Sequence, residues 1–388
     1  MEPIIVENMK SDETRMKLGI LFYFSSQWMG GVIYVINLIK TLNFLDESQK
    51  PEITLFYTPD NKKFLDEIKY PYLTTVEWIF PPIIWGNLES LIIGKNVFIH
   101  KILREYDLDA IYPMHDFPVR TKTKTKLISW CADLQHKHYP EFFTLFQRMQ
   151  RDFRISLGLR NSDKMVLSST DVLNDFNNFF TGSKRTQMRI FRFVSVIEDL
   201  TGIDINDLRN KYKLPEMYFM VSNQFHKHKN HKVLLLALAK LKLGGIKKHL
   251  AITGKFPSAG NSLYLGELHR IIYEHNLHDQ ISFLGVIPRN EQMQIMKHAQ
   301  AVLQPSLFEG WSTVIEDAKS LQVPVIASNL KVNIEQLGDG GLYFEPHNAD
   351  ELSAILERYP IRNIKNVFYE DYNHRIKRAA EELLMIFQ

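Results

Sequence analysis

The sequence predicts an α/β protein made of two doubly wound, parallel-sheet domains. Its 388 residues exceed the roughly 250 to 300 at which a single hydrophobic core stops growing, so two domains are expected. Short apolar runs alternate with amphipathic segments in both halves of the chain, which is the pattern of a parallel sheet covered by helices. A polar stretch poor in strands lies between the two series and predicts a linker.

The N-terminal domain is expected over residues 17–197, after a polar and aperiodic tail at 1–16. Its apolar runs predict strands at 18–24, 53–57, 75–78, 110–112, 127–130 and 165–167. Amphipathic patterns predict helices at 32–42, 61–68 and 141–157. A further helix should follow Ser168 and Ser169, which are good N-cap residues.

The linker is expected at 198–215, where Asp204 is positioned to cap a short helix, and the C-terminal domain at 216–367. Six more strands are predicted, one beginning at Tyr218 and the others at 249–253, 281–284, 301–304, 323–327 and 342–344. The tail at 368–388 predicts one amphipathic helix.

Composition excludes several classes of protein. The net charge of +3 is too small for a dedicated nucleic-acid binder. The single cysteine, Cys131, excludes an internal disulfide and fits a reducing, cytoplasmic compartment. The 22 uncharged residues at 18–39 have the length of a membrane span, but Ser25, Asn37 and other polar residues interrupt them. We interpret this stretch as a strand, a glycine loop and a helix, with a span or signal anchor as the lesser alternative.

The most specific segment is 304–327, QPSLFEGWSTVIEDAKSLQVPVIA, which predicts a strand, a turn, a helix and a second strand. Glu309 and Gly310 fall at the carboxyl end of the first strand, where ligands bind in open α/β folds. The backbone amides that open the helix are expected to point free donors toward a phosphate. They belong to Trp311, Ser312 and Thr313. A capped helix with incidental acids is the simpler alternative.

This segment resembles the donor-binding signature of family 4 retaining glycosyltransferases, which have the GT-B fold. That signature holds two glutamates with seven residues between them; the position eight after Glu309 is Asp317, and Glu316 comes one residue earlier. The resemblance implies that Glu309 binds the transferred sugar and that either Asp317 or Glu316 binds the ribose. It also implies two Rossmann-like domains facing a central cleft, with residues 368–388 returning to the N-terminal domain.

A second match is the loop 221–231, VSNQFHKHKNH, which follows a predicted strand. In the family this loop places a basic pair on the diphosphate, and Lys229 occupies the lysine position. The resemblance implies that this ammonium stabilises the charge that develops on the leaving group. Asn223 stands where the family has an arginine, and Lys227 is the available substitute. We interpret the three histidines of the loop as facing solvent or phosphate, and no metal site is expected.

The glycine loop at 25–32, SSQWMGGV, lies between the first strand and the first helix. Gly30 and Gly31 let the backbone approach a ligand closely. The resemblance places this loop opposite the donor phosphates and the acceptor. By the same resemblance, Gly254 and Lys255 contact the phosphates and Val286 and Ile287 cradle the base.

The segment 133–143 follows the strand that ends at Trp130. Many relatives carry a His-Asp pair here that reaches the transferred sugar, whereas this chain has Ala132 and Asp133. The histidine role therefore falls to His136, with a structural loop histidine as the alternative. An Asp-x-Asp sequence at 107–109 has the spacing of a metal-bound diphosphate site, but it precedes a strand and so lies at the wrong end of the sheet.

The resemblance implies transfer of a sugar from a nucleoside diphosphate sugar to an acceptor hydroxyl, with retention of configuration and without a metal or other cofactor. UDP is favoured over GDP as the donor nucleotide. One alternative is another GT-B enzyme, either a sugar-nucleotide epimerase or an inverting transferase, whose base would come from His115, Asp116 or Asp133. The other is a non-catalytic protein that binds a sugar or nucleotide.

The expected acceptor is a glycan or a lipid-linked sugar. The aromatic, proline-rich stretch at 78–85 is interpreted either as a contact for such an acceptor or as a buried packing segment. We expect a cytoplasmic protein, with peripheral contact at the inner face of the membrane left open. No nucleic-acid partner is expected, and the sequence carries no signal for an oligomeric state.

Overall fold

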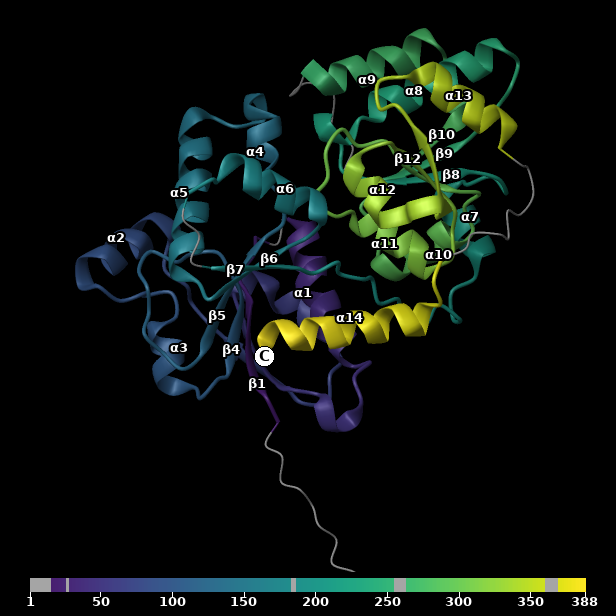
Figure 1. Cartoon of the computed structure of the whole chain (residues 1–388). Coiled ribbons are helices and arrows are strands. Elements are labelled where there is room, and N and C mark those ends of the chain that lie inside the picture. Colours follow the sequence, from purple (N-terminus) through teal and green to yellow (C-terminus); the bar gives the residue numbers. More distant parts are fainter. Residues whose placement is uncertain (1–14, 26–27, 183–185, 255–262, 360–368) are drawn as a thin grey trace, which may run out of the picture.

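A computed structural model describes residues 15–25, 28–182, 186–254, 263–359 and 369–388, and it contains two parallel sheets (Figure 1). The first sheet has seven strands in the order β3-β2-β1-β4-β5-β6-β7. These strands are β1 (Lys17–Phe22), β2 (Glu52–Tyr57), β3 (Leu73–Glu77), β4 (Ala110–Met114), β5 (Lys126–Cys131), β6 (Lys164–Leu167) and β7 (Gln187–Ile190). The sequence predicts the first six, whereas β7 is a short, half-exposed edge strand without a continuous apolar run.

The second sheet has the six predicted strands, in the order β10-β9-β8-β11-β12-β13. They are β8 (Phe219–Ser222), β9 (Leu250–Thr253), β10 (Ile281–Gly285), β11 (Val302–Gln304), β12 (Val325–Ser328) and β13 (Gly341–Phe344). All strand pairs are parallel, so each connection crosses over one face of its sheet. This architecture confirms the predicted fold class.

Helices of the N-terminal half cover both faces of the first sheet. They are α1 (Met29–Leu42), α2 (Ile83–Ile93), α3 (His100–Glu105), α4 (Gln135–His138), α5 (Leu145–Asn161) and α6 (Thr170–Phe179), together with the 3-10 helices η1 (Glu47–Gln49), η2 (Pro59–Glu67) and η3 (Pro140–Phe142). The helix predicted at 61–68 is thus a 3-10 helix. The helix predicted from 141 begins later, because Thr144 and Gln147 form a capping box. Ser169 caps α6 as predicted.

The C-terminal half repeats the arrangement. Its helices are α7 (Ile205–Tyr212), α8 (His231–Leu243), α9 (Leu263–Glu274), α10 (Arg289–Lys297), α11 (Thr313–Ser320), α12 (Lys331–Leu337) and α13 (Ala349–Arg358), with the 3-10 helices η4 (Lys227–Lys229), η5 (His278–Gln280) and η6 (Gly338–Gly340). Asp204 accepts from the amide of Asn206 at the start of α7.

The last helix, α14 (Tyr372–Phe387), runs from the second half back to the first (Figure 1). Asp371 caps it by accepting from the amide of His374. Its apolar face joins the core of the first sheet, where Ile376 and Phe387 are fully buried. The Lys164 ammonium on β6 donates to the carbonyl of Ile386 at 2.7 Å. The two halves are therefore tied together by the end of the chain as well as by the linker.

The uncharged stretch at 18–39 divides between β1 and α1. Within the described ranges, none of the helices combines the length and the apolar character needed to cross a bilayer.

Candidate functional site

The two loops that carry the most specific sequence patterns meet where the strand order of the second sheet reverses. The Lys229 turn follows β8 and the Glu309 loop follows β11, and these strands are neighbours although about 80 residues separate them. In open α/β sheets such a reversal opens a crevice at the carboxyl ends of the strands, where ligands bind. The fold thus brings the two segments together at the carboxyl edge of the second sheet.

Lys229 and Glu309 form an ion pair with 2.6 Å between Nζ and Oε1. Their side chains are mostly shielded from solvent, being 20% and 9% exposed. Gln304, the last residue of β11, donates to the same carboxylate oxygen at 2.7 Å. Its own amide oxygen accepts from Asn223 Nδ2 at 2.8 Å. The carboxylate is therefore held in place from two sides, by a cation and by a buried amide pair.

Asn223 is a buried part of this network, whereas Lys227 is exposed on the turn two residues before Lys229. Asn230, which follows Lys229, has a left-handed backbone with φ of 54°. Its side chain donates to the carbonyls of Pro305 and Pro346 at 3.0 and 2.7 Å. Asn230 therefore connects the lysine turn to the loop that carries Glu309. Sequence reasoning missed Gln304 and Asn230; the signal for Gln304 was a polar residue closing the apolar strand AVL.

The start of α11 differs from its prediction. The Ser312 amide donates to Gln336 Oε1 at 3.1 Å, and the Ser312 hydroxyl caps the helix by accepting from the Ile315 amide. The expectation that Ser312 presents a free amide to a phosphate is therefore wrong. Trp311 is also engaged, since its indole donates to the carbonyl of Phe193 in the other half of the chain at 3.0 Å. Thr313 is the first residue of α11.

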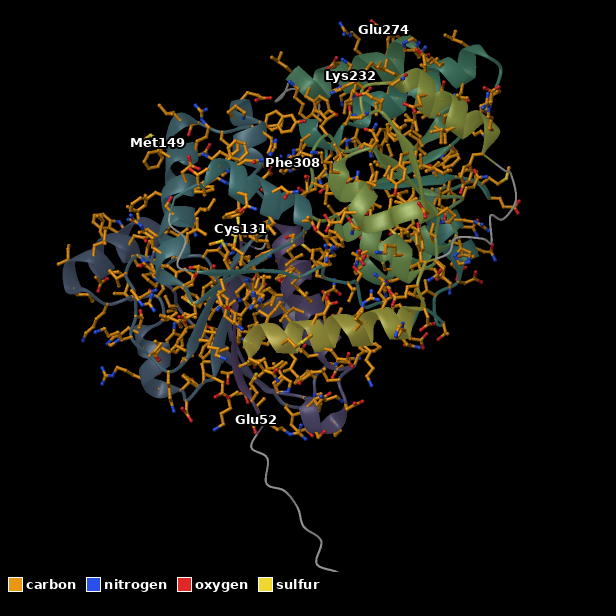
Figure 2. The ribbon with its side chains drawn as sticks, in the orientation of Figure 1. Glu52, Cys131, Met149, Lys232, Glu274 and Phe308 are labelled. Carbon is orange, nitrogen blue, oxygen red and sulfur yellow. The ribbon has the colours of Figure 1, made fainter. Side chains whose placement is uncertain are left out.

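Gly310 lies at the contact between the two halves. A Cβ atom at this position would overlap the carbonyl oxygen of Ala132 and come within 3.0 Å of Asp133 Cβ. Only glycine allows the backbones to approach this closely. Beside it, the Tyr139 hydroxyl donates to the carbonyl of Leu307 at 3.0 Å. Figure 2 shows Phe308 in the same region, between the two halves.

Glu316 is shielded from solvent by the protein around it. It is 1% exposed and pairs with Arg375 of α14, with Lys319 at 3.2 Å and with the Gln336 amide at 2.9 Å. Its assignment as a ribose ligand is therefore wrong, because both carboxylate oxygens are used inside the protein. Its role is to anchor α14 to the second half of the chain.

Asp317 is equally buried and forms a bidentate pair with Arg289, with distances of 2.8 and 2.5 Å. Arg289 opens α10, directly after the loop that contains Val286 and Ile287. Its side chain is 30% exposed and that of Asp317 only 1%, so the arginine, rather than the carboxylate, reaches solvent at this point. Arg289 was not identified from the sequence.

His136 is also buried. Its Nε2 lies 2.8 Å from Asp152 Oδ1, and its side chain has no exposed surface. Burial lowers the pKa of His136, although the bond to Asp152 opposes this shift. This geometry corresponds to the structural alternative and leaves the ring no surface with which to contact a sugar, which corrects its assignment. Asp133, next to Gly310, accepts instead from the Gln135 amide at 3.0 Å.

The glycine loop of the first half begins α1. Gly31 is buried beneath Trp28, whose ring would overlap a Cβ at this position, and its amide donates to the Trp28 carbonyl at 3.0 Å. Gly30 is exposed. The Trp28 ring stacks on Trp130, at the end of β5, with a centroid separation of 5.7 Å. Gly30 and the Trp28 ring therefore form the surface of this loop.

Gly254 ends β9 with a φ of 111°, and a Cβ there would approach the Asn223 carbonyl oxygen to 2.8 Å. It thus packs directly beside the network that holds Glu309. Val286 is exposed and Ile287 half-buried after β10. Lys255, the other predicted phosphate contact of this loop, lies outside the described residues.

The histidines of the lysine turn are held neutral by their surroundings. Burial, followed by the charge of Lys229, lowers the pKa of His228 to about 4 and that of His231 to about 3. The His226 and His228 rings stack with a centroid separation of 5.7 Å. Among the residues that the structure describes, no group of three or more His, Cys, Asp or Glu side chains is arranged to hold a metal ion.

The candidate bases Asp116 and His115 and the Asp-x-Asp sequence are engaged elsewhere. Asp116 is buried in a bidentate pair with Arg154, both bonds being 2.9 Å. Burial lowers the pKa of His115 to about 3. Asp107 pairs with Lys124 at the opposite end of the first sheet.

Residues 204–382 match the family described as glycosyl transferases group 1. O-antigen chain mannosyltransferase B of Escherichia coli is 35% identical over 74 residues, an alignment that spans 19% of this chain and only 19% of that relative. The O-antigen biosynthesis glycosyltransferase WclY of Escherichia coli is 22% identical over 344 residues. This alignment spans 86% of this chain and 86% of WclY.

Solved structures show the same architecture. HepE of Anabaena in complex with UDP-glucose superposes with a TM-score of 0.63 at 18% identity, covering 95% of this chain and 96% of HepE. At this identity the likeness establishes the fold, which is GT-B. The chain therefore has the GT-B fold, and its residues 204–382 are similar to the glycosyl transferases group 1.

Proposed function

We propose that this chain, whose residues 204–382 match the group 1 glycosyl transferases, moves a sugar from a nucleoside diphosphate sugar to an acceptor hydroxyl with retention of configuration. The observation that carries the proposal is the shielded Lys229–Glu309 pair at the carboxyl ends of β8 and β11. A nucleoside diphosphate sugar offers a new partner to each member of this pair. Its diphosphate is an anion that the ammonium can bind, and its sugar hydroxyls can donate to the carboxylate.

Donor binding then amounts to an exchange of partners. A diphosphate carries more negative charge than one carboxylate, so it attracts the Lys229 ammonium out of the pair. Glu309 stays in position because Gln304 still donates to it at 2.7 Å, and it is then free to accept from the sugar hydroxyls. In the reaction, charge grows on the departing phosphate, and a fixed ammonium stabilises that charge more than it stabilises the bound donor.

The residues present supply orientation and charge stabilisation and do not require a resident metal or cofactor in this scheme. In a retaining reaction of this kind the departing phosphate accepts the proton of the acceptor hydroxyl on the same face of the sugar. The two halves contact each other closely at Gly310 and Tyr139, and we propose that this contact limits the access of water to the sugar, which favours transfer over hydrolysis.

UDP is the proposed donor nucleotide, and HepE, which shares the fold, was solved with UDP-glucose. The acceptor is proposed to be a glycan or a lipid-linked sugar, since the relatives WclY and mannosyltransferase B are named for O-antigen synthesis. A cytoplasmic location is part of the same proposal.

A nucleotide panel tests the donor, and matched lysine variants test the site. UDP should raise the melting temperature more than GDP, because ligand binding to the native state stabilises it by mass action. Lys229→Ala should lower turnover of UDP-sugars by about 100-fold or more. Lys232→Ala is the matched control, because Lys232 of α8 (Figure 2) forms a pair of the same 2.6 Å length with Glu267 of α9, and this pair is more exposed to solvent.

Equal activity of the two variants would remove the phosphate role of Lys229. The anomeric configuration of the product, read by proton NMR, tests retention, and turnover in the presence of EDTA tests metal independence. Nucleotide binding without release in the presence of any acceptor would favour a binding protein instead.

A further inference from the structure

Helix α2 is inverted relative to an ordinary surface helix. Its small and polar residues face the protein: Ser90 is fully buried and donates to the Gly86 carbonyl at 2.6 Å. Gly86 packs against the Phe98 ring. The outward residues are well exposed and, apart from Glu89, apolar; the apolar ones are Ile83, Ile84, Trp85, Leu88, Leu91, Ile92 and Ile93. Trp85 is 69% and Ile92 84% exposed, so this face is left in water at a substantial free-energy cost.

Helix α5 carries a second apolar row. It consists of exposed residues at helical spacing, namely Leu145, Phe146, Met149 and Phe153. Figure 2 shows Met149 at the outer edge of the molecule, on the same side as α2 in Figure 1. The two helices are joined through Asp116, which accepts from Arg154 of α5 at 2.9 Å and from Asn87 of α2 at 3.5 Å. We call these two exposed apolar rows the α2–α5 surface.

Basic side chains accompany this surface. Residues 83–101 and 145–161, which hold the two helices and the segment after α2, contain six Lys or Arg and two Asp or Glu, a net charge of +4, whereas the whole chain carries only +3. Helix α5 alone holds four arginines and one acid between its ends. Exposed lysines also flank α2, among them Lys95 and Lys101. An apolar face bordered by positive charge complements a layer with an apolar interior and an anionic rim.

We propose that the α2–α5 surface docks on an anionic lipid membrane, with the apolar rows in the acyl boundary and the basic residues at the headgroups. A second copy of this chain fits less well. A two-fold dimer would place the same patch against itself and would bring two regions of charge +4 together. The proposal goes beyond the sugar-transfer function, because it concerns where the protein sits and needs no donor chemistry.

Vesicle flotation of the full chain tests the docking. The protein should partition onto vesicles of phosphatidylcholine with roughly one-third phosphatidylglycerol at least about tenfold more than onto pure phosphatidylcholine, and added salt should release part of it. The double variant Trp85→Ser, Ile92→Ser should lose about tenfold or more of the partition. Both side chains are exposed, so the fold should tolerate the change.

The matched control is Leu243→Ser, Tyr273→Ser, which removes two comparably exposed apolar side chains, 82% and 79%, from the other half of the chain. Its vesicle binding should equal that of the unchanged protein. Absence of flotation with the anionic vesicles, or equal binding by the two double variants, would overturn the proposal. So would a dimer in light scattering that only the α2 variant abolishes. The UDP thermal shift, measured on the same proteins, reports separately on the donor site.

Discussion

Adding one methyl group at Gly310 tests the close contact between the two halves of the chain. In the structure the added Cβ would overlap the carbonyl oxygen of Ala132 and lie 3.0 Å from its carbonyl carbon. Both atoms belong to backbone, so no flexible side chain can move aside. The two halves must move apart, or the Glu309 loop must shift.

The same substitution elsewhere should have the opposite sign. Gly310→Ala should lower the free energy of unfolding by about 1 to 3 kcal/mol, the usual cost of overpacking. Gly266 lies in α9, and a Cβ there meets no atom within 4 Å. Gly266→Ala should therefore raise the free energy of unfolding by about 0.5 to 1 kcal/mol, because alanine is the better helix former.

Urea unfolding of the three proteins measures these changes, and donor turnover measures the effect on the site. Gly310→Ala should also lower kcat, because displacement of the neighbouring Glu309 by about 1 Å spoils the reacting geometry. If Gly310→Ala unfolds at the same or a higher urea concentration than the unchanged protein, the two halves are not in close contact at this position. A lower free energy of unfolding in Gly266→Ala would instead show that Gly266 is not a valid control for the added methyl group.

Three further predictions concern ionisable side chains that have partners or are buried inside the protein. Arg375→Met leaves the buried Glu316 of α11 without its main cation and should lower the free energy of unfolding in urea by roughly 3 kcal/mol. Lys377→Met, on the same helix but with an exposed partner, should lower it by less than about 1 kcal/mol. If the Arg289–Asp317 pair binds the nucleotide, Arg289→Gln should raise KM for the donor about tenfold and leave kcat nearly unchanged; an unchanged KM would exclude that role. Burial lowers the pKa of His231 to about 3, so the folded state favours the neutral ring. The free energy of unfolding should therefore fall as the pH drops from about 6.5 toward 3, by up to ~1.4 kcal/mol per pH unit. His231→Phe should reduce this pH dependence, and an unchanged pH dependence would contradict the lowered pKa.

The sequence by itself determined the order and type of most elements. Alternating apolar runs located twelve of the strands, since a buried parallel strand must be apolar on both faces. It also placed Lys229 and Glu309 after strands, and neighbouring parallel strands end at the same edge of a sheet. These inferences need only local pattern. The inverted helix α2 escaped them, because its sequence, IIWGNLESLII, is apolar nearly all round the helix and so has little helical periodicity.

The tertiary structure alone decided what each polar side chain contacts. Glu316 pairs with Arg375, which lies 59 residues away, and Asp317 pairs with Arg289 of a different helix. Neighbouring acids with the same local pattern thus received different partners. His136 became a buried partner of Asp152, and the Ser312 amide was taken by Gln336. Such pairings depend on which groups converge after the chain has packed, and a buried charge or amide must find a partner there.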